Sequence, residues 1–401
     1  FLAGRVLTAV GGGAMVPVGM AVLGDVYPRE KRATALGTLG AIDTAGWVWG
    51  PLYGALLIRF LSWQWQFYLN IPLALIGIAA AWWALADLPH PAAKGRIDWW
   101  GTLTLSAALL ALNIALLNSG DVQSAGGFAS LNANPPAPAW PYFLAAALAF
   151  ALFLLIETRR APSAALPLIP LSLFRRRNFS AAMLINFLVG SVLIIAMVNV
   201  PLIVNVLAVD VAEAALLSGG LLSGMTLAMA IFSYVGGRLT ERWRYRPVTL
   251  VGLWLCALGF YWMGRWQATA VGDHTPYTQM AWQLVVLGVG FGLVIAPVGT
   301  AVINAAPDDQ RGIASSLVIV MRLMGMSVGL SGLTAWGLRR FEVLRTQITL
   351  PDLPLSDPAY QQAIVDGLTH VTVAVLAETF LVSVLLVALA WLIALTLKLD
   401  E

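Results

Sequence analysis

The chain has 401 residues, of which 59% are hydrophobic and 11% are charged. A soluble domain carries about 25% charged residues, so this composition predicts a polytopic all-α membrane protein and excludes a sizeable soluble domain. The formal net charge of +3 comes from basic residues scattered over short loops, unlike the clustered basic face of a nucleic-acid-binding protein. The single cysteine, Cys256, excludes an internal disulfide.

Eleven apolar segments are long enough to cross a bilayer, which takes roughly 20 helical residues. The loops between them are alternately rich and poor in lysine and arginine, and the rich side is expected to be cytoplasmic. This places the C-terminus in the cytoplasm and the protein in the cell (inner) membrane, although Arg339, Arg340 and Arg345 fall on the opposite side. The predicted segments are 1–25, 33–58, 66–86, 98–118, 140–157, 179–207, 213–235, 247–267, 279–304, 312–338 and 367–397.

The second segment carries a regular row of small residues. Gly46, Gly50 and Gly54 recur every fourth residue and therefore share one face of a helix. Glycine at this spacing lets a neighbouring helix approach closely, and Pro51 predicts a bend because it removes one backbone donor. Asp43 lies three residues before Gly46, on or near the same face. Such a helix is suited to pack closely on a neighbouring helix, to move against it and to carry a charge within the membrane.

Three loops have a distinct character. Residues 119–139 contain no basic residue and are predicted to form a flexible external linker. Residues 339–366 contain three prolines and are predicted to cap the outer mouth. Residues 166–174 are largely apolar and precede three arginines, which predicts a segment lying on the inner membrane surface.

An internal repeat indicates how the chain is organised. Residues 17–23 (PVGMAVL) match residues 297–303 (PVGTAVI), and the turn that begins at Pro28 matches the turn that begins at Pro307. Repeated halves are typical of secondary transporters. In the second half of the chain, three segments (179–207, 213–235 and 247–267) precede the matching helix, whereas none precedes the first copy. By symmetry we expect three further helices upstream. We therefore expect the rest of an N-terminal six-helix bundle at 1–86, a two-helix insertion with an inner linker at 87–178, and a C-terminal six-helix bundle at 179–401.

Several motifs resemble the major facilitator superfamily and, within it, the fourteen-helix drug:proton antiporters (EmrB/QacA-like). Arg5-Val-Leu-Thr-Ala-Val-Gly-Gly-Gly13 resembles the arginine-bearing motif of the family's fourth helix, and Gly46 to Gly54 resembles the antiporter motif of its fifth helix. Gly237-Arg-Leu-Thr-Glu241-Arg242 is similar to the second inner-loop motif, with Glu in place of the usual Asp. The resemblance implies a major facilitator fold in which the eleven segments correspond to helices 4–14 of 14.

Four charged residues are candidates for proton coupling. The resemblance implies that Arg5 keeps a nearby acid ionised, and the alternative is an arginine that extends to the outer surface. Asp43 is a buried acid suited to carry a proton, or else a solvated acid in a vestibule. Arg322 resembles a family position, and it could pair with Glu378. Glu378 is otherwise a structural partner or a residue near the outer mouth.

Further residues are candidates for a gate and a cavity. The face formed by Gly46, Gly50, Pro51 and Gly54 is expected to move during alternating access, with static packing as the alternative. The turn around Gly237, Glu241 and Arg242 is expected to latch an inner gate, or simply to fix the topology. A central cavity could be lined by asparagines, namely Asn70, Asn186, Asn199 and Asn304.

Matches to enzyme motifs are chance occurrences. Residues 325–329 (GMSVG) fit a nucleophile elbow but lie in a predicted membrane helix without a nearby histidine. The three histidines are scattered and form no metal spacing. There is no phosphate-binding loop, so we do not expect ATP to drive the protein. We expect neither enzymatic activity nor a cofactor or metal.

These features predict a monomeric, proton-driven exporter of drug-like amphipathic or cationic compounds, working between the bilayer and a small-molecule substrate without any nucleic acid. The proton gradient would supply the energy. Two alternatives remain open. The first is a major facilitator that exports a metabolite, a lipid or a sugar, and the second is a membrane scaffold or sensor that does not transport.

Overall fold

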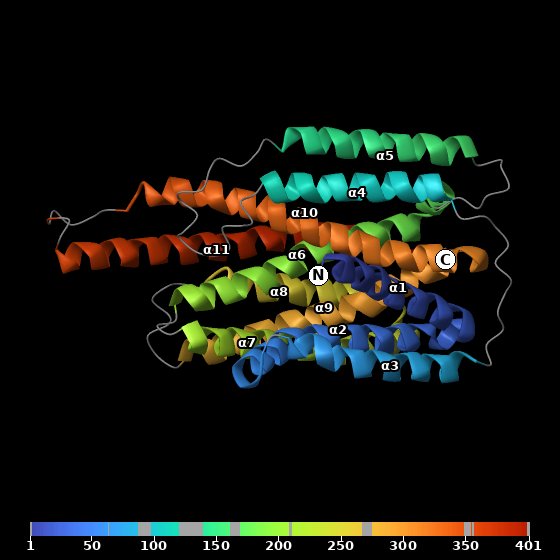
Figure 1. The fold of residues 1–401 in the computed structure, drawn as a ribbon, viewed down its shortest axis with the longest axis horizontal. Helices are drawn as coiled ribbons and strands as arrows, with labels where there is room; N and C mark the ends of the chain where they lie inside the picture. The colour runs from blue at the N-terminus through green and yellow to red at the C-terminus, as the bar shows by residue number, and fades with distance from the viewer. Residues whose placement is uncertain are drawn as a thin grey trace.

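The computed structural model describes residues 2–62, 64–86, 98–119, 139–160, 169–207, 211–266, 275–348, 354 and 357–398. Over this part the regular elements are helices (Figure 1). Two short 3₁₀ turns are η3 (Leu171–Arg175) and η5 (Asp308–Gln310). The α-helices are α1 (Leu2–Val26), α2 (Arg29–Phe60), α3 (Trp65–Leu85), α4 (Trp99–Ser119), α5 (Trp140–Arg160), α6 (Arg177–Leu207), α7 (Val211–Trp243), α8 (Tyr245–Met263), α9 (Thr275–Ala305), α10 (Arg311–Arg345) and α11 (Pro358–Ala394).

The eleven helices confirm the eleven predicted apolar segments. In the described part of the chain, ten of them are long and apolar enough to cross a membrane. The helix outside those ten is α2, whose first turns are charged and which carries Asp43. The predicted linker at 119–139 lies almost entirely outside the described residues.

The loop predicted at 339–366 is shorter in the structure than expected. Helix α10 continues to Arg345, and α11 already begins at Pro358. Proline suits the first helical turn because its missing N–H would be unpaired there in any case. Asp357 caps this turn by accepting a hydrogen bond from the Ala359 amide at 2.9 Å. Both helices therefore extend beyond their neighbours at one end of the bundle (Figure 1).

We expect Asp357→Ala to loosen the first turn of α11 without disturbing the rest of the bundle. Loss of an N-cap costs about 0.5–2 kcal/mol, and this cap lies at the projecting end of the helix. Hydrogen exchange of the amides at 359–362 should accelerate several-fold, while exchange in α6 stays unchanged. Equal exchange rates in the two proteins would show that the cap contributes nothing.

The helices lie along the long axis of the molecule, and consecutive helices are antiparallel (Figure 1). One end of the bundle holds the α1–α2, α7–α8 and α9–α10 turns together with the start of α6, and we call it the basic end because arginines gather in these turns. The segment before α6 follows its prediction in part, since Leu173 of η3 is buried while Leu171 and Phe174 are exposed. The α4–α5 hairpin lies on the outside of the bundle, next to α10 (Figure 1).

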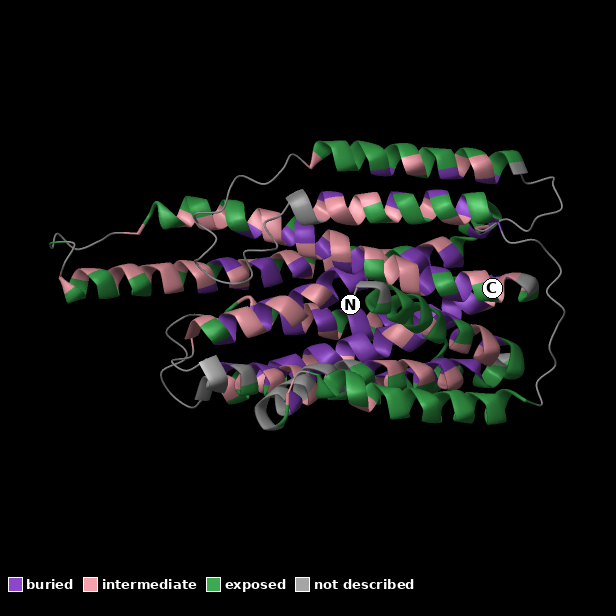
Figure 2. Ribbon diagram, in the orientation of Figure 1, coloured by how far each residue is buried: buried purple, intermediate pink, exposed green. Residues whose placement is uncertain are grey.

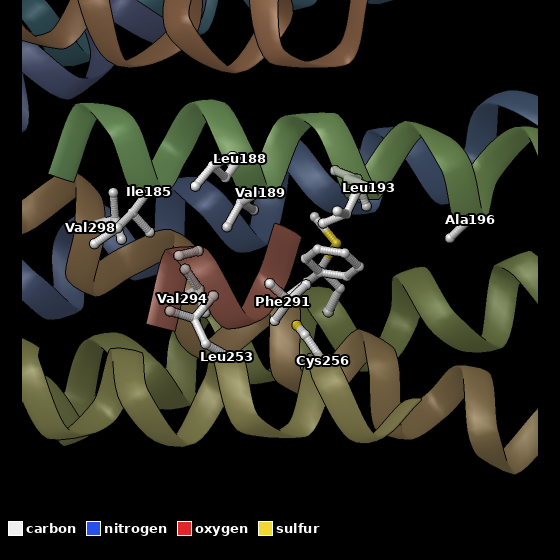
Figure 3. Packing of buried hydrophobic residues seen from close by; sticks show 14 of the residues in the cluster. Ile185, Leu188, Val189, Leu193, Ala196, Leu253, Cys256, Phe291, Val294 and Val298 are labelled. Carbon is white, nitrogen blue, oxygen red and sulfur yellow. The ribbon is translucent and has the colours of Figure 1, made fainter. Parts of the chain in front are cut away.

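The hydrophobic core lies among α6, α8, α9 and α11 (Figure 2). Figure 3 shows Leu253 and Cys256 of α8 facing Phe291 and Val294 of α9, beneath the apolar side chains of α6. By contrast, α3 contains no buried residue, and most of α5 is exposed. The core thus fixes α6, the helix against which α10 packs.

Candidate functional site

An acid and a base on two different helices lie within electrostatic reach of each other. Asp43 lies on α2, Arg322 lies on α10, and each interacts electrostatically with the other. Both side chains are partly buried. A charge within the hydrocarbon layer is costly unless it is paired or lines a cavity, so this pair is the first candidate for function.

A third polar side chain completes this site. Arg322 Nε donates a hydrogen bond to Asn186 Oδ1 on α6, at 3.3 Å. Asn186 Nδ2 in turn donates to the carbonyl oxygen of Val318, one turn before Arg322 on α10. We call Asp43, Asn186 and Arg322 the polar cluster. It joins α2, from the first half of the chain, to α6 and α10, from the second half.

Glycines hold α6 and α10 close enough for this geometry. A Cβ atom added at Gly190 of α6 would lie 2.3 Å from the carbonyl oxygen of Arg322. A Cβ atom added at Gly325 of α10 would lie 2.0 Å from the carbonyl oxygen of Phe187. The backbones are therefore in contact, as small residues allow between membrane helices. The position of Arg322 is set by this contact.

Asp43 and Arg322 fall at matching positions of the two repeated hairpins. Asp43 follows Pro28 by 15 residues, and Arg322 follows Pro307 by the same 15 residues. They occupy equivalent positions on equivalent helices of the two copies. At this shared position one copy supplies an acid and the other a base.

A second group of contacts closes the basic end between α2 and α7. A Cβ atom added at Gly237 would lie 2.4 Å from the Ala33 carbonyl oxygen, so the two backbones touch. Ser233 Oγ donates to the Gly37 carbonyl oxygen at 3.2 Å. Glu241 Oε1 accepts a hydrogen bond from the Thr34 amide at 3.1 Å. The predicted latch residues Gly237 and Glu241 thus lie at a helix contact, whereas Arg242 is exposed.

Two arginines cross between the repeated turns at the same end. Arg32 Nη1 donates to Asn304 Oδ1 at 2.9 Å. Arg311 Nη1 forms an ion pair with Asp25 Oδ1 at 3.2 Å. We call these four residues the reciprocal clasp.

The two halves of the clasp are equivalent in the repeat. Asp25 and Asn304 each precede the proline of their turn by three residues, and Arg32 and Arg311 each follow it by four. Each copy therefore reaches to the helix end of the other copy. One contact is an ion pair, and the other joins a charge to a neutral amide.

The remaining charged candidates lie elsewhere. The guanidinium carbon of Arg5 lies 5.7 Å from the ring centroid of Phe67 on α3. Glu378 does not pair with Arg322, because Arg340 holds both of its carboxylate oxygens, with Nε–Oε2 at 2.7 Å and Nη2–Oε1 at 3.1 Å. Sequence reasoning missed Arg340 because it assigned that residue to a loop.

The predicted glycine face gives a mixed outcome. Gly46 is exposed, and a Cβ atom added there would meet nothing within 4 Å. The side-chain positions of Gly50, Pro51 and Gly54 lie outside the described residues, although the α2 backbone continues through them. Close packing occurs further toward the basic end, at Gly37.

The four predicted cavity asparagines do not share one cavity. Asn70 is exposed on α3. Asn186 belongs to the polar cluster and Asn304 to the clasp. Asn199 Nδ2 donates to Thr379 Oγ1 on α11 at 2.6 Å. Asn186, Asn199 and Asn304 each have a polar partner on a different helix, as expected for amides withdrawn from water.

The comparison with known families settles the identity of the fold. A profile described as "Major Facilitator Superfamily" matches residues 1–330. The chain belongs to the major facilitator superfamily. This superfamily is a family of transmembrane transporters, not of enzymes.

Relatives in this superfamily include triacylglyceride transporters of mycobacteria. The chain is 34% identical over 349 residues to the "Triacylglyceride transporter" of Mycobacteroides abscessus, covering 85% of this chain and 64% of the relative. It is 34% identical over 371 residues to a triacylglyceride transporter of Mycolicibacterium hassiacum, covering 90% and 66%. The chain therefore spans somewhat less than two thirds of the length of these relatives.

A solved structure is also similar to this major facilitator chain. It is a bacterial homologue of the human lysosomal transporter Spinster, in an inward-facing and occupied conformation. The identity is 14% and the TM-score 0.46, over 98% of this chain and 92% of that one.

Proposed function

We propose that the full-length protein exports a strongly apolar lipid of the triacylglyceride class, and that proton movement drives the export. The lipid class is supported by the printed names of relatives at 34% identity. This reading favours the lipid alternative over the drug-like substrates expected from the sequence. The proton coupling is supported by the Asp43–Arg322 pair.

The Asp43–Arg322 pair suits proton coupling because protonation of Asp43 changes the electrostatic attraction between the two side chains. While Asp43 is ionised, its attraction to Arg322 holds α2 and α10 together across the two halves. A proton on Asp43 removes that attraction and leaves α10 free to move relative to α2. Asn186 keeps Arg322 in place meanwhile through its 3.3 Å hydrogen bond. The single observation that carries the proton-coupling part of this proposal is an acid and a base, in electrostatic interaction, at equivalent positions of the two repeats.

The basic end supplies the gate in this proposal. It faces the cytoplasm by the excess of arginine and lysine there. The two halves are the remaining N-terminal bundle at 1–86 and the bundle at 179–401, with 87–178 between them. The clasp and the α2–α7 contact hold the halves together at this end, so they must part for substrate to enter from the cytoplasmic side.

Asn304→Asp is expected to hold the basic end shut, because it turns the Arg32 contact into a second ion pair. Spin labels at Lys31→Cys and Arg242→Cys should show a larger closed population, and transport should fall several-fold. Asp25→Asn should act in the opposite direction. The native Cys256 is buried and leaves these labels without background. Unchanged distance distributions in both variants would exclude the clasp as a gate.

A second candidate is efflux of amphipathic or cationic compounds, favoured by the likeness of Gly46 to Gly54 to the antiporter motif. A substrate panel on full-length protein in proteoliposomes separates the two. We expect a labelled triacylglyceride to move under a pH gradient and cationic dyes to stay. Dye movement without lipid movement would reverse the assignment.

A further inference from the structure

Among the described residues, the α4–α5 hairpin packs on the bundle mainly through α10. Helix α5 packs on α4, and α4 packs on α10. The segment after α5 is tied back by Glu157, which accepts a hydrogen bond from the Ile169 amide at 3.0 Å. The hairpin therefore touches the transporter chiefly along α10, the helix that carries Arg322 (Figure 1).

One polar contact lies in this α4–α10 seam. Ser327 Oγ donates a hydrogen bond to Asn113 Oδ1 at 2.9 Å. Asn113 Nδ2 donates to the Leu109 carbonyl oxygen one turn back, also at 2.9 Å. Both functional groups of the amide are thus engaged. The amide nitrogen bonds to its own helix, and the amide oxygen accepts from α10.

Ser327 donates its hydrogen bond to another helix and not to its own backbone. A serine or threonine inside a helix commonly donates to a carbonyl oxygen one turn back. Several hydroxyls in this chain do so, including Ser191, Thr300 and Ser316. The bond that Ser327 makes instead crosses to another helix. The hydrogen bond of Ser327 therefore links α10 to α4.

Ser327 follows Arg322 by five residues, which corresponds to about 140° around the helix axis and about 7.5 Å along it. Arg322 is held by α6 on one side, and Ser327 is held by α4 on another side of α10. Rotation of α10 about its axis would strain both contacts together. The hairpin contact thus limits how Arg322 can turn relative to Asp43.

We propose that the α4–α5 hairpin positions Arg322 for coupling, through the Asn113–Ser327 hydrogen bond. Asn113 and Ser327 are positioning residues, because neither touches the polar cluster. The inference rests on the proposed function of that cluster. It gives the inserted hairpin a role in setting the pH at which the transporter works.

The test uses full-length protein in proteoliposomes and measures the pH profile of lipid transport. Ser327→Ala and Asn113→Leu should each shift the pH midpoint and lower the rate about threefold, the typical weight of one hydrogen bond between membrane helices. The double variant should do no more than either single one, and Ser327→Thr should restore the profile. Ser316→Ala is the matched control, since Ser316 lies on the same helix and bonds to Gly312 of its own helix.

Two outcomes would overturn the inference. One is a lower rate with an unshifted midpoint, which indicates a purely structural contact. The other is additive effects in the double variant, which show that the two residues act independently. Asp43→Asn separates this failure from that of the proposed function. If Asp43→Asn alters the profile and the hairpin variants do not, only the hairpin role is lost.

Discussion

Asp43→Asn in the full-length protein is expected to lower proton-driven lipid transport by at least about tenfold. The amide keeps the size of the side chain but carries no charge and cannot exchange a proton. The remaining rate should no longer depend on pH. Transport in proteoliposomes, measured across a series of imposed pH gradients, tests both effects.

The control variants for this experiment are available in the same chain. Asp366→Asn changes an exposed acid on α11 that accepts a hydrogen bond from Gln362 at 3.0 Å, and it should leave transport intact. The double variant Asp43→Asn/Arg322→Gln removes both charges and avoids an uncompensated arginine in the membrane. It should fold at least as well as the single variant and still lack pH dependence. A pH-dependent rate in Asp43→Asn would exclude the coupling role.

Gly325→Ala is expected to lower the free energy of unfolding by about 1–3 kcal/mol, the usual cost of overpacking. The new methyl group would lie 2.0 Å from the Phe187 carbonyl oxygen, and backbone atoms cannot move aside as a side chain can. Helices α6 and α10 would have to separate. Thermal unfolding of the purified protein measures the loss of stability.

Gly332→Ala on the same helix provides the comparison. A Cβ atom there meets nothing within 4 Å, so the added methyl group should be neutral or slightly stabilising, since alanine favours helix more than glycine does. Because Arg322 lies one turn from Gly325, the Gly325→Ala variant should also disturb transport. Equal melting temperatures for the two variants would contradict the close contact between α6 and α10.

The position of the helices could be predicted because bilayer thickness imposes long apolar runs. The predicted segment 140–157 corresponds to α5 at Trp140–Arg160. The outer parts of α10 and α11 could not be predicted in this way, because hydropathy ends where the apolar layer ends. At their projecting ends these two helices are stabilised by particular contacts, namely the Arg340–Glu378 ion pair and the Asp357 N-cap.

The polar cluster could be predicted only in part. Asp43 and Arg322 stand out as charges in apolar sequence, but 279 positions separate them and periodicity within one helix cannot join them. The missing signal was in the repeat: aligning Pro28 with Pro307 brings Asp43 onto Arg322. The same alignment brings Asp25 onto Asn304 and Arg32 onto Arg311. The hydrogen bond from Arg322 to Asn186 had no such signal, because α6 lies outside the aligned hairpins.

Simultaneous recording of proton and lipid flux in one set of proteoliposomes is the most direct test of the central claim. The full-length protein should move protons inward whenever a labelled triacylglyceride moves outward, even with no pH gradient imposed beforehand. Replacing Asp43 with asparagine should abolish that proton flux. Lipid export unaccompanied by protons in the unmodified protein would contradict the account.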